Sequence, residues 1–95
     1  MYMNEDMIMS KLLEDYCYET NDEFGGVQKL YQFDNKMGAS VIKHEHSYGG
    51  KLGLWELAVL DGAGKIDYST SITDDVLGRL TWKEVTNTLR QIQRL

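Results

Sequence analysis

The chain has 95 residues, of which 42% are hydrophobic and 26% are charged, and its formal net charge is −5. This length allows one compact domain and excludes two, and the apolar content excludes a disordered chain. The acidic balance argues against nucleic-acid binding, because contacts to phosphates need clustered Lys and Arg side chains.

The cysteine count and the length of the apolar runs indicate the cellular compartment in which the protein resides. Cys17 is the single cysteine, so no disulfide forms within one chain, and we expect it to be a small apolar filler in a reducing environment. Glu5 and Asp6 stand where a signal peptide would have its apolar run. The longest uninterrupted apolar stretch, Leu57–Leu60, is too short to cross a bilayer. We therefore expect a cytoplasmic protein without a membrane partner.

The N-terminal pattern predicts an amphipathic helix over about residues 5–18. Asn4 is a suitable N-cap, and the acids that follow it favour the positive end of the helix dipole. Apolar side chains then recur every three or four positions, at Ile8, Met9, Leu12, Leu13, Tyr16 and Cys17. The polar run 19–26 ends in two glycines and predicts a loop.

Four strands are predicted next, and three short turns that contain glycine join them in chain order. The strands are Val27–Phe33, Ala39–His46, Leu54–Leu60 and Ile66–Ser71. Short connections imply antiparallel neighbours, so the strands are expected to form a meander.

The C-terminal part is predicted to hold a short capped turn and then a helix. Thr73 caps the turn, Asp74 and Asp75 favour its N-terminus, and Gly78 ends it in the left-handed region. Thr81 and Glu84 have the spacing of a capping box. One face of the helix then carries Trp82, Val85, Leu89, Ile92 and Leu95, and a polar face carries Lys83, Asn87, Arg90 and Arg94. The predicted fold is α+β, a four-stranded antiparallel meander sheet flanked by an N-terminal and a C-terminal helix.

The predicted sheet has apolar side chains on both faces. If the hairpin closes symmetrically about Gly50, one face holds Val41, Trp55, Leu57 and Val59, and the other holds Ile42, Leu54, Ala58 and Leu60. If both helices cover one face, a second chain is needed for the other, most simply in a symmetric homodimer. One helix on each face would instead give a closed monomer.

Side chains that carry chemistry are few. His44 and His46 project from one side of a predicted strand, with Glu56 opposite His44, and could share a metal ion. No complete ligand set is visible, so we expect neither metal nor cofactor. No motif exposes a serine nucleophile, and the glycines around Lys51 precede a strand instead of the helix that a P-loop requires. We therefore predict that the protein is not an enzyme.

Acidic residues concentrate in the N-terminal third. Residues 1–34 hold eight acidic and two basic side chains, and residues 35–95 hold seven and eight. An acidic face either keeps the protein soluble or occupies a basic site on another protein. The candidate interaction surface comprises Glu14, Asp15, Glu19, Asp22, Glu23, His44, His46 and Tyr48.

Five segments within about residues 31–95 carry a family resemblance: Gly38–His44, Ser47–Gly50, Gly53–Leu60, Ile72–Gly78 and Leu80-Thr81. They resemble a group of short uncharacterised bacteriophage and prophage proteins. The resemblance assigns no activity and no catalytic residue. It implies a phage setting, in which small acidic proteins often bind and block a host factor, and hence the host-cell cytoplasm.

Three functions follow from these observations. The first is a phage-type accessory protein that binds a host protein and inhibits or redirects it. The second is a structural or assembly homodimer without a host target. The third is a small metal-dependent enzyme that uses His44 and His46. We rank them in this order and expect no nucleic-acid partner.

Overall fold

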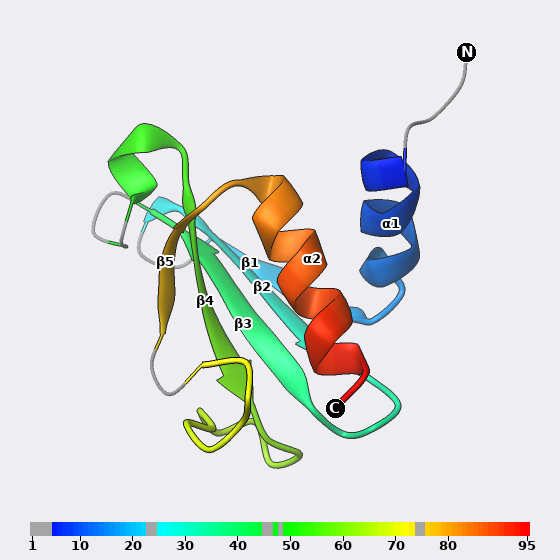
Figure 1. Ribbon diagram of the computed structural model, residues 1–95. Coiled ribbons are helices and arrows are strands. Elements are labelled where there is room, and N and C mark those ends of the chain that lie inside the picture. Colours follow the sequence, from blue (N-terminus) through cyan, green and yellow to red (C-terminus); the bar gives the residue numbers. More distant parts are fainter. Residues whose placement is uncertain (1–4, 23–24, 45–46, 48, 74–75) are drawn as a thin grey trace.

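The computed structural model describes residues 5–22, 25–44, 47, 49–73 and 76–95, with side chains from residue 8 onward. Its strands form one five-stranded antiparallel sheet in chain order, and Figure 1 shows both α-helices on the same side of it. The elements are α1 Glu5–Glu14, β1 Cys17–Asn21, β2 Val27–Gln32, β3 Gly38–Lys43, the 3₁₀-helix η2 Gly50–Leu52, β4 Trp55–Leu60, β5 Leu77–Leu80 and α2 Trp82–Gln93. The α+β class and the antiparallel meander are thus confirmed, but the sheet has five strands instead of four.

The first additional strand is β1, which replaces the predicted end of the N-terminal helix and the start of the loop. The helix ends at Glu14, and the backbone N–H of Tyr16 donates to the Leu13 carbonyl at 3.0 Å. Cys17 then lies opposite Tyr31 of β2. Pairing with β2 satisfies the backbone of this segment, so it prevails over a helical pattern that local spacing alone suggested.

The predicted strand Ile66–Ser71 is wrong apart from its first residue. Ile66 forms an isolated bridge with Leu60, and the Asp67 N–H donates to the Val59 carbonyl at 2.8 Å. Asp67 Oδ1 then accepts hydrogen bonds from the backbone and the hydroxyl of Ser69. Such side-chain bonds turn the backbone away from the sheet ladder.

β5 occupies the sheet edge instead, in the region predicted as a capped turn. Gly78 lies within this strand, and Arg79 has the left-handed conformation expected of Gly78, with φ 57°. Asp74 and Asp75, the predicted acids of that turn, lie outside the described residues. Pairing with β4 therefore outweighs the local capping signals.

The hairpin of β3 and β4 differs from the prediction by two residues in register. β3 ends at Lys43 instead of His46, and Glu56 lies opposite Ile42 instead of His44. The connection contains η2, flanked by Gly49 and Gly53 in the left-handed region, with φ of 82° and 75°. A shift of two residues keeps every side chain on its face, so the predicted division of apolar residues between the two faces still holds.

α2 begins as the sequence predicts. Thr81 Oγ1 accepts from the Glu84 N–H at 3.2 Å, and Glu84 Oε1 accepts from the Thr81 N–H at 3.0 Å, which completes the capping box. Val85, Leu89 and Ile92 are fully buried, whereas Leu95 is exposed.

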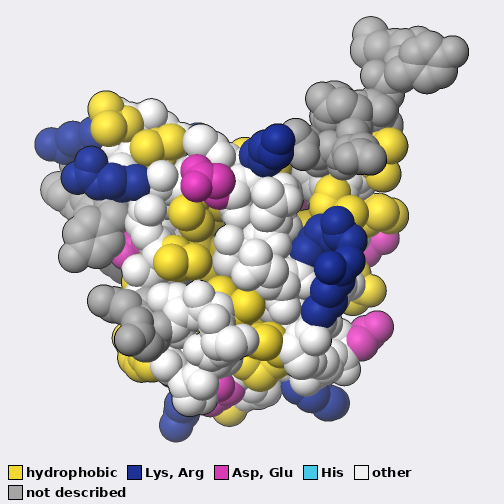
Figure 2. All heavy atoms as spheres, viewed as in Figure 1, with side chains coloured by type: hydrophobic (Ala, Val, Ile, Leu, Met, Phe, Trp, Pro, Cys, Tyr) yellow, Lys and Arg dark blue, Asp and Glu magenta, His cyan; other side chains and the backbone are white. Residues whose placement is uncertain are grey.

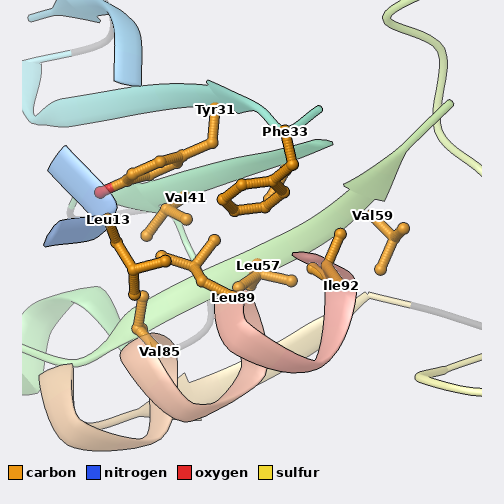
Figure 3. Close-up of a cluster of buried hydrophobic side chains, with 10 residues drawn as sticks. Leu13, Tyr31, Phe33, Val41, Leu57, Val59, Val85, Leu89 and Ile92 are labelled. Carbon is orange, nitrogen blue, oxygen red and sulfur yellow. The ribbon is translucent and has the colours of Figure 1, made fainter. Parts of the chain in front are cut away.

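The core lies between the sheet and the two helices. Figure 3 shows side chains from β2, β3 and β4 directed toward α2, together with Leu13 of α1. The Trp82 indole N–H donates to Ser10 Oγ at 2.9 Å and so joins α2 to α1. Both helices therefore cover one face, and the alternative of one helix on each face is wrong.

Candidate functional site

The second face of the sheet carries an apolar hollow of about 390 Å³. Its sheet residues include Leu30, Ile42, Ala58 and Leu60. Ile66, in the connection between β4 and β5, lines it from one side and is 46% exposed, whereas Ala58 and Leu60 are only 8% and 6% exposed. In the described part of the chain, no helix packs on this face. The hollow thus has a deep apolar floor and one accessible apolar wall.

A second, more polar hollow of about 220 Å³ continues from the first, because Leu60 and Gly64 line both. It extends past Gly38 to Tyr18 of β1, whose side chain is 60% exposed. We call the two hollows together the groove. The groove has an apolar section over β4 and an exposed tyrosine near the β1 edge.

A chain of side-chain hydrogen bonds crosses the same face from β1 to β3. Asn21 Nδ2 donates to Glu19 Oε2 and to Gln28 Oε1, both at 3.0 Å. Gln28 Nε2 in turn donates to Ser40 Oγ at 3.0 Å. The two hydrogens of the Asn21 amide are both used, so this network holds the Glu19 carboxylate in place beside the groove.

The charged side chains of the inner sheet are divided between its faces. Lys29 and Lys43 lie on the helix side, where their Nζ atoms are 5.7 Å from the Trp82 ring and 4.7 Å from the Trp55 ring. The two indole rings are themselves 5.0 Å apart. Glu56 lines the groove on the opposite face. The strand cations are thus engaged with aromatic rings, and the groove side is acidic.

The structure separates the residues of the predicted interaction surface. Glu14 lies on the helix side and pairs with Lys29 at 2.8 Å, while Glu19 lies on the groove side. Asp15 and Asp22 are exposed at the ends of α1 and β1. His44 follows β3, and its N–H donates to Ser47 Oγ at 3.0 Å. Glu23, His46 and Tyr48 lie outside the described residues.

Two kinds of chemical group were considered among the described residues: clusters that could hold a metal ion, and side chains with a shifted pKa. Among them, no three His, Cys, Asp or Glu side chains gather as a metal site, and the predicted pair of His44 and His46 is only half described. Burial, with smaller effects from Glu14 and Cys17, raises the pKa of Tyr31, so this phenol stays protonated within the core. Its position between sheet and helix indicates a structural role.

Several groove residues were not singled out from the sequence. Leu30 and Gln28 alternate along β2, and this period-two pattern could have placed them on one face. Ile66 and Val76 had no comparable signal, because their position depends on the path of the connection between β4 and β5.

In the described part of the chain, no helix has both the length and the apolar character needed to span a membrane. Comparisons with protein-family models, with curated proteins and with solved structures found no match.

Proposed function

We propose that this chain is a small phage-type accessory protein that binds a host protein and inhibits or redirects it. It acts by occupying a surface of that protein and not by catalysis. The groove is its contact surface, and the cytoplasm of the host cell is its place of action.

The observation that carries this proposal is the apolar sheet face that neither α1 nor α2 covers. Leu30, Ile42 and Ile66 line the groove while α1 and α2 cover only the opposite face. Apolar surface that becomes buried against a partner contributes about 25 cal/mol per Å² to the free energy of association, so an apolar groove favours binding. Tyrosine is enriched at the energetic centres of interfaces, which suits the exposed Tyr18.

The metal-dependent enzyme receives less support. It needs a third ligand or an orienting carboxylate beside the two histidines, and Glu56 was the candidate. Glu56 lies opposite Ile42 and lines the groove, two residues away from the position facing His44.

The homodimer is the second candidate, and one observation favours it. Both helices lie on the same side of the sheet, which is the arrangement that leaves a face for a second chain. Light scattering at micromolar concentration tests it directly. A mass near the 10.9 kDa of one chain contradicts the dimer, and twice that mass supports it.

The proposed function is tested by affinity capture from host lysate with two matched variants. Ile66→Arg places a charge on the groove wall, while Leu52→Arg makes the same kind of change in η2, where Leu52 is 72% exposed and does not line the groove. We expect the wild-type protein and Leu52→Arg to retain one host protein that Ile66→Arg does not retain. Equal capture by all three, or capture by none, contradicts the proposal.

A further inference from the structure

The charged side chains in the lining of the groove are acidic, and Lys36 lies beside Gly62 at its polar end. Glu56 and Asp61 are the charged residues that line it, and among the described residues no Lys or Arg does so. Glu19 adds a third carboxylate on the same face, held by Asn21 at 3.0 Å. The lysines of the inner strands, Lys29 and Lys43, lie on the opposite face. A partner that fits this face therefore carries positive charge around an apolar centre.

The concave shape of the groove disfavours a second copy of this chain as its occupant. Two such faces packed together would enclose two hollows of about 390 Å³ each, whereas protein interfaces are packed nearly as densely as cores. A two-fold arrangement would also bring the acidic groups of one copy toward those of the other, with no strand lysine on this face to offset them.

We infer that the groove takes a basic amphipathic α-helix of the partner protein. This inference rests on the proposed function, since it names the element that binds the groove. The apolar stripe of the helix packs on Leu30, Ile42 and Ile66, above a floor formed by Ala58 and Leu60. Lys and Arg beside the stripe pair with Glu56. A helix of about 13 residues is about 20 Å long, which matches the length of a six-residue strand of this sheet.

The probe is a labelled peptide of about 14 residues, with leucines at helical positions i, i+3, i+4, i+7 and lysines elsewhere. Two control peptides accompany it: one has glutamates in place of the lysines, and the other has the same composition with its leucines distributed around the helix. Binding is followed by fluorescence anisotropy, and the contact surface is mapped from amide shifts in nuclear magnetic resonance spectra.

Two pairs of protein variants complete the design. Ile66→Arg is compared with Leu52→Arg, as above, and Glu56→Gln is compared with Asp15→Asn, which removes a carboxylate from the exposed end of α1. We expect Ile66→Arg to weaken binding by about tenfold or more. Glu56→Gln should weaken it by about threefold, and the two control variants by less than about twofold. Amide shifts should centre on Leu30, Ile42 and Ala58.

The inference is overturned if the peptide with distributed leucines binds equally well, if the shifts centre on α2, or if no peptide binds. If the wild-type protein is a homodimer and the Ile66→Arg variant is a monomer, the groove is assigned to a second copy of the chain instead. Lysate capture that depends on Ile66, without peptide binding, would reject the helix and leave the proposed function intact. Loss of both results would reject both proposals.

Discussion

Replacing Asn35 with alanine removes the side chain that joins the turn between β2 and β3 to the end of α2. Asn35 Nδ2 lies 2.9 Å from the Ile92 carbonyl oxygen, 3.2 Å from that of Gln93 and 3.1 Å from that of Leu95. Its Oδ1 accepts from the Met37 N–H at 3.0 Å. Carbonyls in the last turn of a helix lack the usual partner four residues ahead. Asn35 therefore satisfies the Gln93 and Leu95 oxygens and adds to the 3.2 Å bond that the Ile92 oxygen already accepts from the Leu95 N–H.

The expected loss of stability follows from these contacts. The amide has two hydrogens for three carbonyls, so Asn35 makes two full donor bonds and one acceptor bond. At about 0.5–1.5 kcal/mol each, three bonds would contribute up to about 4.5 kcal/mol. The contact with Leu95 is exposed, and water replaces it at little cost. We therefore expect Asn35→Ala to lower the free energy of unfolding by about 1–3 kcal/mol.

Asn35→Asp separates the link to α2 from the turn itself. Aspartate keeps the acceptor for Met37 and is favoured in turns, but it loses both donors and places a negative charge at the negative end of the α2 dipole. We expect this variant to lose at least about 1 kcal/mol at neutral pH. The neighbouring change Asp34→Asn, at an exposed position, should stay within about 0.5 kcal/mol.

Urea unfolding followed by tryptophan fluorescence measures all three variants, because Trp55 and Trp82 lie 5.0 Å apart in the folded protein. With a slope of about 1 kcal/mol per molar urea, a loss of 1–3 kcal/mol moves the midpoint by about 1–3 M. If Asn35→Asp leaves the free energy of unfolding unchanged, only the bond to the Met37 N–H matters, and the role assigned to the helix carbonyls is refuted.

Two further predictions concern α2. Leu89→Ala should cost about 2–4 kcal/mol, because it leaves a cavity in a fully buried site; a loss below about 1 kcal/mol in urea unfolding would contradict that burial. The Thr81 backbone N–H, and then its side chain, lower the pKa of Glu84, so this carboxylate stabilises the fold above its unfolded pKa and ceases to do so as pH falls through the folded value. Glu84→Gln should therefore flatten the fall of the urea midpoint below about pH 5, and an unchanged slope would argue against the capping box as its source.

Local sequence patterns determine some elements of this fold more strongly than others, for physical reasons. α2 was predicted well because its signals are local: Thr81 and Glu84 lie within one turn, and Leu89 continues one apolar face. β1 and β5 were missed because local patterns there favoured the end of a helix and a capped turn, and each segment is a strand only through its neighbour. Such pairing depends on contacts between distant residues, which local patterns do not encode.

The groove was only half predictable for a related reason. Alternation along two central strands places Ile42, Ala58 and Leu60 on one face, and this assignment survives a register error of two residues. The wall formed by Ile66 depends on where the chain leaves β4. That path is influenced by hydrogen bonds of the Asp67 side chain, which β-propensity does not anticipate.

The two faces of the sheet also bear on whether a second copy of this chain could supply the helix inferred to bind the groove. The chain has a basic amphipathic helix of its own, α2, but Val85, Leu89 and Ile92 are fully buried against the opposite face. Its outward side is polar, and Figure 2 shows Lys and Arg side chains gathered beside it on the helix side of the molecule. The α2 helix of a neighbouring copy could therefore offer the groove positive charge but no apolar stripe. The α1 helix of such a copy exposes Ile8 and Leu12, but it carries three acidic residues and one basic residue and so lacks the positive charge. Since charge alone contributes little at a solvated surface, neither helix of a second copy has both features inferred for the helix that binds the groove.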